Sequence, residues 1–254
     1  MPKLEIHVSS NLEELSRAAA EVFVETARAR IETAGGFFAA LSGGATPRRL
    51  YELLATSAHS DRIAWPKLHL FQVDERCVPP DHSDSNFRMI REALLVPSRM
   101  PPENFPRMAG EQADASEAAC QYALELGRAI PNREGNCPCF DLVFLGMGND
   151  GHTASLFPGS PALEERECWV CPSSPGEGGL PRITLTYPVL NAVALIVFLV
   201  SGSEKAATLE RVLEGPHAPQ LLPAQGISPV NGRLLWYVDE AAASRLHGIS
   251  RSRE

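Results

Sequence analysis

The sequence has no long hydrophobic run and no excess of positive charge. Its longest apolar stretch, Ala192 to Val200, is far shorter than the roughly 20 residues that a membrane-spanning helix needs, and it predicts a buried strand instead. The formal net charge of −8 argues against a general binder of nucleic acid or of anionic membranes. The N-terminus lacks a basic segment followed by an apolar one, so we expect no secretory signal and a cytoplasmic protein.

Familiar metal-binding and hydrolase motifs are also missing. The short cysteine spacings, Cys137/Cys139 and Cys168/Cys171, come without supporting histidine spacing, so reduced and mostly packed thiols are a better interpretation than a zinc site. Neither Gly-x-Ser-x-Gly nor His-Glu-x-x-His occurs, which argues against covalent serine catalysis and zinc hydrolysis. We therefore expect a site without metal or organic cofactor.

The sequence does contain a regular alternation of strands and helices. Its 254 residues, 44% of them hydrophobic, suffice for a sizeable core, and we expect one domain over residues 1–254. The predicted strands are 4–8, 37–41, 68–73, 140–145, 182–187, 193–200 and 234–238. The predicted helices are 11–31, one from residue 47, 86–95, 113–130, 203–213 and one after residue 238. This order predicts an α/β fold whose mostly parallel sheet is covered on both faces and binds ligands beyond the carboxyl ends of its strands.

A glycine-rich turn joins the strand at 37–41 to the next helix. Gly43 and Gly44 allow backbone N–H groups to approach an anion closely, and Thr46 adds a hydroxyl. The helix N-terminus contributes partial positive charge, although the Gly-Lys-Ser/Thr element of a Walker A loop is absent. The turn has the features of a phosphate cradle; the alternative is a tight strand-to-helix turn that binds nothing.

Charged residues lie at the ends of other predicted strands. Asp74 and Arg76 follow the strand at 68–73, where a carboxylate can orient a sugar hydroxyl or transfer a proton and an arginine can meet an anion. The alternative for this segment is a local salt-bridge cluster. Arg182 and Lys205 also lie near strand ends and can supply the cations that an acidic chain needs for a phosphorylated substrate. Taken singly, each of these two is better interpreted as a surface charge.

The segment with the most candidate functional residues follows the apolar strand at 140–145. It carries three glycines, an aspartate and a histidine, namely Gly146, Gly148, Gly151, Asp150 and His152. Histidine suits general acid–base work near neutral pH, and a neighbouring carboxylate can fix its tautomer. We predict that His152 is functional and that Asp150 supports it.

The same segment formally matches the dinucleotide fingerprint G-x-G-x-x-G, which is a weak signal by itself. Pro158 would interrupt the helix that should follow, and the next candidate strand, 168–171, does not end in the acidic residue expected for a ribose. We therefore do not expect a nicotinamide cofactor.

Taken together, these segments resemble the 6-phosphogluconolactonase family, which is related to the glucosamine-6-phosphate isomerase/deaminases. The matching segments occur in order at 41–47, 74–78, 85–86, 146–159, 182–188, 201–206 and 229–239. The string from Asp150 to Pro158 is the most specific of them. The resemblance implies a Rossmann-like three-layer α/β sandwich. It also implies hydrolysis of 6-phospho-D-glucono-1,5-lactone to 6-phospho-D-gluconate in the pentose phosphate pathway.

The resemblance also assigns roles to residues of this chain. The phosphate loop corresponds to Ser42, Gly43, Gly44, Ala45 and Thr46, and the basic phosphate contacts correspond to Arg182 and Lys205. The catalytic histidine corresponds to His152 with Asp150 beside it, and the strand-end acid to Asp74 with Arg76 close by. Ala45 departs from the Ser or Asn that the family often has, so one possible hydroxyl contact is lost while the backbone amide remains.

The implied mechanism is activation of water by His152, with Arg76 a candidate to stabilise the oxyanion. The nearest rival is the isomerase/deaminase reaction, whose enzymes carry an acid in an Ile-Ala-Phe-Asn-Glu-type continuation after the histidine. Residues 153–157 contain no acid, which favours the lactonase. A non-catalytic sugar-phosphate sensor is a second alternative. We expect a small-molecule phosphorylated sugar lactone as the partner of a monomer or weak homodimer, with no nucleic acid and no membrane.

Overall fold

The central layer of the molecule is a six-stranded sheet in which every strand pairing is parallel. The structure is a computed structural model that describes residues 5–247. The strand order is β1-β11-β10-β7-β2-β3. The strands are β1 (Glu5–Ser9), β2 (Phe37–Leu41), β3 (Leu68–Gln72), β7 (Leu142–Leu145), β10 (Leu195–Val200) and β11 (Arg233–Asp239). The predicted α/β fold with a parallel central sheet is confirmed.

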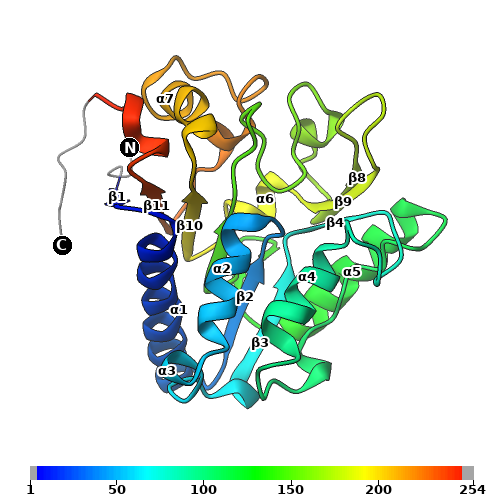
Figure 1. The fold of residues 1–254 in the computed structure, drawn as a ribbon. Coiled ribbons are helices and arrows are strands. Elements are labelled where there is room, and N and C mark those ends of the chain that lie inside the picture. The colour runs from blue at the N-terminus through cyan, green and yellow to red at the C-terminus, as the bar shows by residue number, and fades with distance from the viewer. Residues whose placement is uncertain (1–4, 248–254) are drawn as a thin grey trace.

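Helices cover both faces of this sheet (Figure 1). They are α1 (Leu12–Ala34), α2 (Ala45–Leu54), α3 (Ser57–Ser60), α4 (Asn86–Ile90), α5 (Ala115–Ala129), α6 (Tyr187–Leu190) and α7 (Ala206–Glu214). Side chains of successive strand residues point to opposite faces, so Phe37 packs into the core under α1 and α2 while Phe38 packs into the core under α5. The fully buried strand residues explain why the sequence shows short, continuous apolar runs.

Three further strands form a small antiparallel sheet. The sequence predicted the strand at 182–187 but not this separate sheet. The three strands are β4 (Asp74–Arg76), β8 (Val170–Ser173) and β9 (Arg182–Leu185), in the order β4-β9-β8. The link to the main sheet is Val73, whose N–H donates to the Leu41 carbonyl oxygen and whose own carbonyl oxygen accepts from the Leu185 N–H. Arg76 therefore lies in a strand instead of a loop. A two-residue hairpin, β5 (Arg133–Glu134) with β6 (Cys137–Pro138), completes the strands.

Several predicted boundaries shift for local reasons. α1 runs on to residue 34 because Gly35, at φ 79°, provides the left-handed residue that ends it. The predicted strand at 182–187 ends at Leu185, where the short α6 begins. The helix predicted after residue 238 is only a 3₁₀ turn, Ala242–Arg245, within the described residues. Residue 4 of the first predicted strand and residues 248–254 lie outside them.

A buried carboxylate joins β2 to the segment before β7. Asp141 accepts hydrogen bonds from the Phe38 N–H at 2.9 Å and from Arg30 Nε at 2.7 Å. Replacing Asp141 with alanine should lower the free energy of unfolding by about 2–4 kcal/mol, because two charge-assisted bonds are lost and a buried N–H is left without a partner. Urea unfolding would measure the loss. As a control, alanine at the exposed Asp61 should change the free energy of unfolding by less than about 0.5 kcal/mol. If Asp141→Ala has an equally small effect, this role for Asp141 is contradicted.

The order of the strands determines where a ligand site can form. β2 and β7 are neighbours, but the chain continues from β2 to β3 on one side and from β7 to β10 on the other. This is a topological switch point, where parallel sheets leave a crevice outside the carboxyl ends of their strands. The segments that follow β3, β2, β7 and β10 are the ones that carry the predicted site residues.

Two features that mark other kinds of function are absent from the described residues. Within residues 5–247, no helix combines the length and apolar character that crossing a bilayer requires. Over the same range, histidine, cysteine and acidic side chains form no group of three that could hold a metal ion.

Candidate functional site

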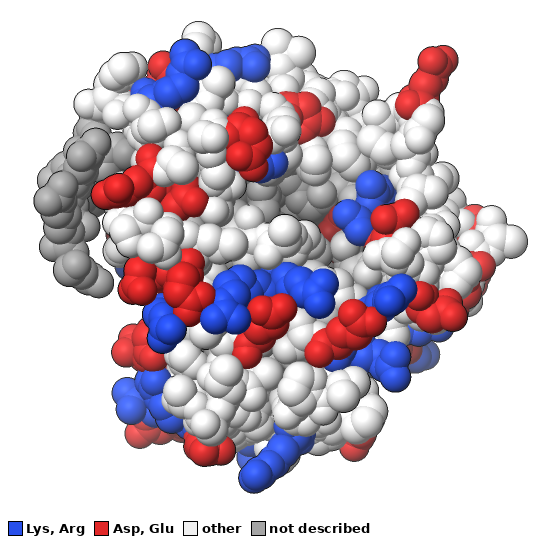
Figure 2. Space-filling model, in the orientation of Figure 1, with Lys and Arg blue, Asp and Glu red and all other residues white. Residues whose placement is uncertain are grey.

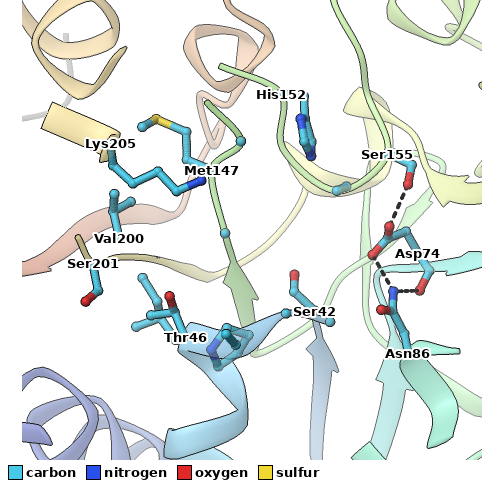
Figure 3. A pocket seen from close by; sticks show the side chains of 18 of the residues that line it. Ser42, Thr46, Asp74, Asn86, Met147, His152, Ser155, Val200, Ser201 and Lys205 are labelled. Atoms are coloured by element: carbon cyan, nitrogen blue, oxygen red, sulfur yellow. Dashed lines mark hydrogen bonds between the residues drawn. The ribbon is translucent and has the colours of Figure 1, made fainter. Parts of the chain in front are cut away.

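A cavity of about 410 Å³ lies over the switch point. It is lined by all but one of the predicted site residues, namely Ser42, Gly43, Gly44, Ala45, Thr46, Asp74, Arg76, His152, Arg182 and Lys205. Asp150, the exception, contacts the ring of His152 instead. Figure 2 shows the opening as a hollow near the centre of this face. In the view of Figure 3, Thr46 and Lys205 lie to one side of the cavity and Asp74 to the other, with His152 above the space between them.

The glycine-rich turn presents the N-terminus of α2 to the cavity. Gly44, at φ 113°, precedes the helix, and the first turn of α2 contains no acidic residue, so its partial positive charge is not neutralised locally. The turn is held from below: the Ser42 hydroxyl donates to the Phe144 carbonyl oxygen at 2.7 Å, and the Tyr51 hydroxyl donates to the Ser42 carbonyl oxygen at 2.8 Å. The Ser42 hydroxyl therefore already donates its hydrogen bond to the protein backbone.

Three cations reach the cavity without a carboxylate partner. Arg76, Arg182 and Lys205 form no ion pair with any residue from 5 to 247, whereas other arginines such as Arg49 do. Arg76 and Arg182 are direct neighbours across β4 and β9, and the Nε atom of each is buried with no acceptor among the described residues. Two like charges side by side destabilise a strand pair. The arrangement therefore favours an anion in the cavity.

His152 and Asp150 form a tight pair at the mouth of the cavity. The His152 ring Nδ1 lies 2.6 Å from Asp150 Oδ1, which also accepts from the His152 backbone N–H at 3.1 Å. The hydrogen bond with the ring lowers the pKa of Asp150 to about 2, so this carboxylate stays ionised at neutral pH. An ionised Asp150 stabilises the tautomer with a proton on Nδ1 and leaves Nε2 as a proton acceptor.

Neighbouring residues fix this pair in place. A side chain at Gly148 would put its Cβ 2.0 Å from His152 Nδ1 and 2.5 Å from Asp150 Oδ1, so only glycine leaves room for the contact. Phe157 also packs against the ring, with its centroid 4.7 Å from that of His152. The loop is tied to α7, where the Thr208 hydroxyl donates to the Asn149 carbonyl oxygen at 2.6 Å.

Asp74 lies in the wall of the cavity with both carboxylate oxygens engaged. The Ser155 hydroxyl donates to Oδ2 at 2.6 Å, and Asn86 Nδ2 approaches Oδ1 at 3.2 Å (Figure 3). Burial raises the pKa of Asp74, while the hydrogen bond from Ser155 and the nearby charge of Arg76 oppose that rise. The structure thus brings the strand-end acid to the site but surrounds it with donors.

The sequence prediction missed several residues that line the cavity, above all Asn86 and Ser155. They belong to matching segments of the resemblance, yet neither residue type has a spacing that indicates a site. Both are almost fully buried, and nothing in the local sequence around either residue indicates that burial. Ser201, Glu204, Met147 and Phe157 also line the cavity.

Comparisons with known proteins agree with this arrangement. The family model described as glucosamine-6-phosphate isomerases/6-phosphogluconolactonase matches residues 10–236. The chain belongs to this family.

Individual members of the glucosamine-6-phosphate isomerase/6-phosphogluconolactonase family are similar over most of their length. The 6-phosphogluconolactonase of Synechocystis is 42% identical over 82% of this chain and 83% of its own. The human 6-phosphogluconolactonase is 40% identical over 95% of this chain and 93% of its own. The structure of the 6-phosphogluconolactonase from Trypanosoma brucei superposes with a TM-score of 0.87 at 29% identity, covering 97% of this chain and 100% of that one. The resemblance found in the motifs is confirmed, and these three proteins carry the name of the lactonase.

Proposed function

We propose that this protein hydrolyses 6-phospho-D-glucono-1,5-lactone to 6-phospho-D-gluconate, the lactonase step of the pentose phosphate pathway, without metal or organic cofactor. The observation that carries the proposal is the cavity itself, which combines an anion-binding helix N-terminus and unpaired cations with a histidine–aspartate pair. The names of the relatives support the same activity. A phosphate anchor and a base within one small cavity fit a compact phosphorylated ester.

The phosphate is held at the turn before α2. Backbone N–H groups of residues 43–46 and the helix N-terminus face the anion, and Lys205 and Arg182 supply full positive charges. Lys205 and Thr46 lie on the same side of the cavity in Figure 3. Anchoring the phosphate there places the lactone ring in the space beneath His152.

His152 then acts as the general base. Its Nε2 takes a proton from a water molecule while the water oxygen bonds to C1, and the carbonyl electrons move onto the carbonyl oxygen. When the tetrahedral intermediate collapses, the C1–ring oxygen bond breaks and the imidazolium returns the proton to the departing oxygen. Asp150 holds the tautomer and stabilises the imidazolium, and Arg76 stabilises the oxyanion.

The isomerase/deaminase reaction is the principal rival because the two activities share the family. In this chain the residue that packs on the His152 ring is Phe157, and residues 153–157 supply no acid to work with the histidine. The experiment is a paired assay with the purified protein: acid release from 6-phosphogluconolactone and ammonia release from glucosamine 6-phosphate. We expect the first alone. Ammonia release alone would overturn the proposal, and neither activity would favour a sugar-phosphate sensor.

Removing one phosphate contact should act on binding more than on turnover. Lys205→Ala should raise KM for the phosphorylated lactone about 10–100-fold, because a charge-assisted hydrogen bond contributes about 1.5–3 kcal/mol, while kcat changes little. Steady-state kinetics would measure both constants. Alanine at the exposed Lys67 serves as the control for lost charge. An unchanged KM in Lys205→Ala would remove this lysine from the phosphate site.

A further inference from the structure

We propose that Asn86 is a positioning residue that couples the phosphate-binding turn to Asp74; the inference deepens the proposed function and rests on it. The Asn86 side chain is almost completely buried, with 2% of the residue exposed. Its Nδ2 donates to the Asp74 backbone carbonyl oxygen at 2.9 Å and approaches the Asp74 carboxylate Oδ1 at 3.2 Å. One amide group thus holds both the backbone and the side chain of the acid.

The other end of the same amide touches the phosphate-binding turn. A Cβ on Gly43 would lie 1.7 Å from Asn86 Oδ1 and 2.2 Å from its Cγ, so the amide occupies the space of a side chain at that position. The backbone of Gly43 lies outside the left-handed region, unlike that of Gly44 at φ 113°. The two adjacent positions therefore require glycine for different reasons. Position 44 has a positive φ, and at position 43 a side chain would collide with the Asn86 amide.

Asn86 cannot easily move away from either neighbour. Its backbone N–H donates to Glu75 Oε1 at 2.7 Å, and the N–H of the next residue, Phe87, donates to Oε2 at 2.7 Å. Ser85 donates its hydroxyl to the same carboxylate at 3.0 Å. Because Glu75 directly follows Asp74, the start of α4 is fixed to the strand that carries the acid.

These contacts form a continuous path between the two ends of the substrate site. It runs from Gly43 through Asn86 to Asp74. From Asp74 it continues to Ser155 in the loop that carries His152, and Figure 3 shows the part from Asn86 to Ser155. Asn86 is the member that touches both the turn and the acid. Loss of its hydrogen bonds to Asp74 should lower turnover, whereas displacement of its amide by a side chain at residue 43 should also distort the turn and weaken phosphate binding.

A double-mutant cycle tests this coupling. Asn86→Ala should lower kcat at least tenfold with less than a threefold change in KM. Gly43→Ala, whose methyl group collides with the amide, should lower kcat similarly and raise KM at least tenfold. In the double variant the methyl group enters the space left by the amide, so KM should return to within threefold of the unchanged protein while kcat stays at the Asn86→Ala value. Independent, multiplying effects on KM would overturn the proposal.

Further measurements distinguish failure of the coupling from failure of the proposed function and from loss of folding. Asn231→Ala, on an exposed asparagine, should leave both constants unchanged, and thermal unfolding shows whether each variant is folded. The rise in the thermal unfolding temperature of each variant on adding inorganic phosphate measures anion binding at the turn. This measurement does not depend on catalytic turnover. If phosphate protection is lost in Gly43→Ala and regained in the double variant, the coupling is supported even if the protein hydrolyses no lactone. Absence of lactone hydrolysis would then count against the proposed function alone. Protection not regained in the double variant overturns the coupling.

Discussion

Replacing His152 with alanine should lower kcat for 6-phosphogluconolactone about 10²–10⁴-fold, the usual contribution of a general base. KM should change little, because the proposed phosphate contacts at the turn and at Lys205 remain. The reason is geometric: Asp150 holds Nδ1 of the ring at 2.6 Å and so leaves Nε2 to accept the proton of the attacking water. Initial rates over a range of lactone concentrations, with the uncatalysed rate subtracted, give both constants.

The matched control for this change is alanine at His217, an exposed histidine that is not among the residues lining the cavity. It should leave kcat and KM unchanged. His152→Gln preserves much of the side-chain volume but cannot take up a proton, and it should be nearly as slow as the alanine variant. Near-normal turnover in either His152 variant would show that another group activates the water.

Replacing Gly148 with alanine should lower kcat by about 10²-fold or more, although it removes no reacting group. The added methyl carbon would lie 2.0 Å from His152 Nδ1 and 2.5 Å from Asp150 Oδ1, so the pair must separate. The backbone of Gly148 lies outside the left-handed region, so alanine adds no strain of its own there. Loss of the aspartate contact frees the ring to take the other tautomer, which removes the base.

Asp150→Asn breaks the same contact from the other side and should give a similar loss. Because both changes act through one pair, the double variant should be scarcely slower than either single one. Gly36→Ala is the control, since its Cβ would meet nothing closer than 3.5 Å and kcat should not change. If Gly148→Ala retains normal kcat, the ring of His152 works from a different position.

The parts of the site that follow a strand directly were predictable from the sequence. Asp150 and His152 are two residues apart in the loop after β7. One short segment therefore shows both that the residue types suit acid–base chemistry and that they lie close together. The glycine-rich turn after β2 was visible for the same reason, and the parallel sheet follows from alternating apolar runs and helical patterns. In each case the contact that matters joins residues close in the chain.

The parts that depend on distant segments were not predictable. Asn86 meets Gly43 only because α4 starts on Glu75, and Ser155 meets Asp74 only because a second sheet brings β4 beside β9. That sheet is built from three short strands whose residues show no long alternating pattern. The pairing of Arg76 with Arg182 likewise appears only in the strand register.

The most direct test of the central claim compares two lactones that differ only in the phosphate. Purified protein, in excess chelator, is given freshly prepared 6-phosphogluconolactone or unphosphorylated gluconolactone, and acid release is followed at matched concentrations. A metal-free site that anchors the phosphate and activates water with His152 predicts rapid turnover of the phosphorylated lactone and little of the other. No turnover above the uncatalysed rate, or equal turnover of both lactones, would contradict it.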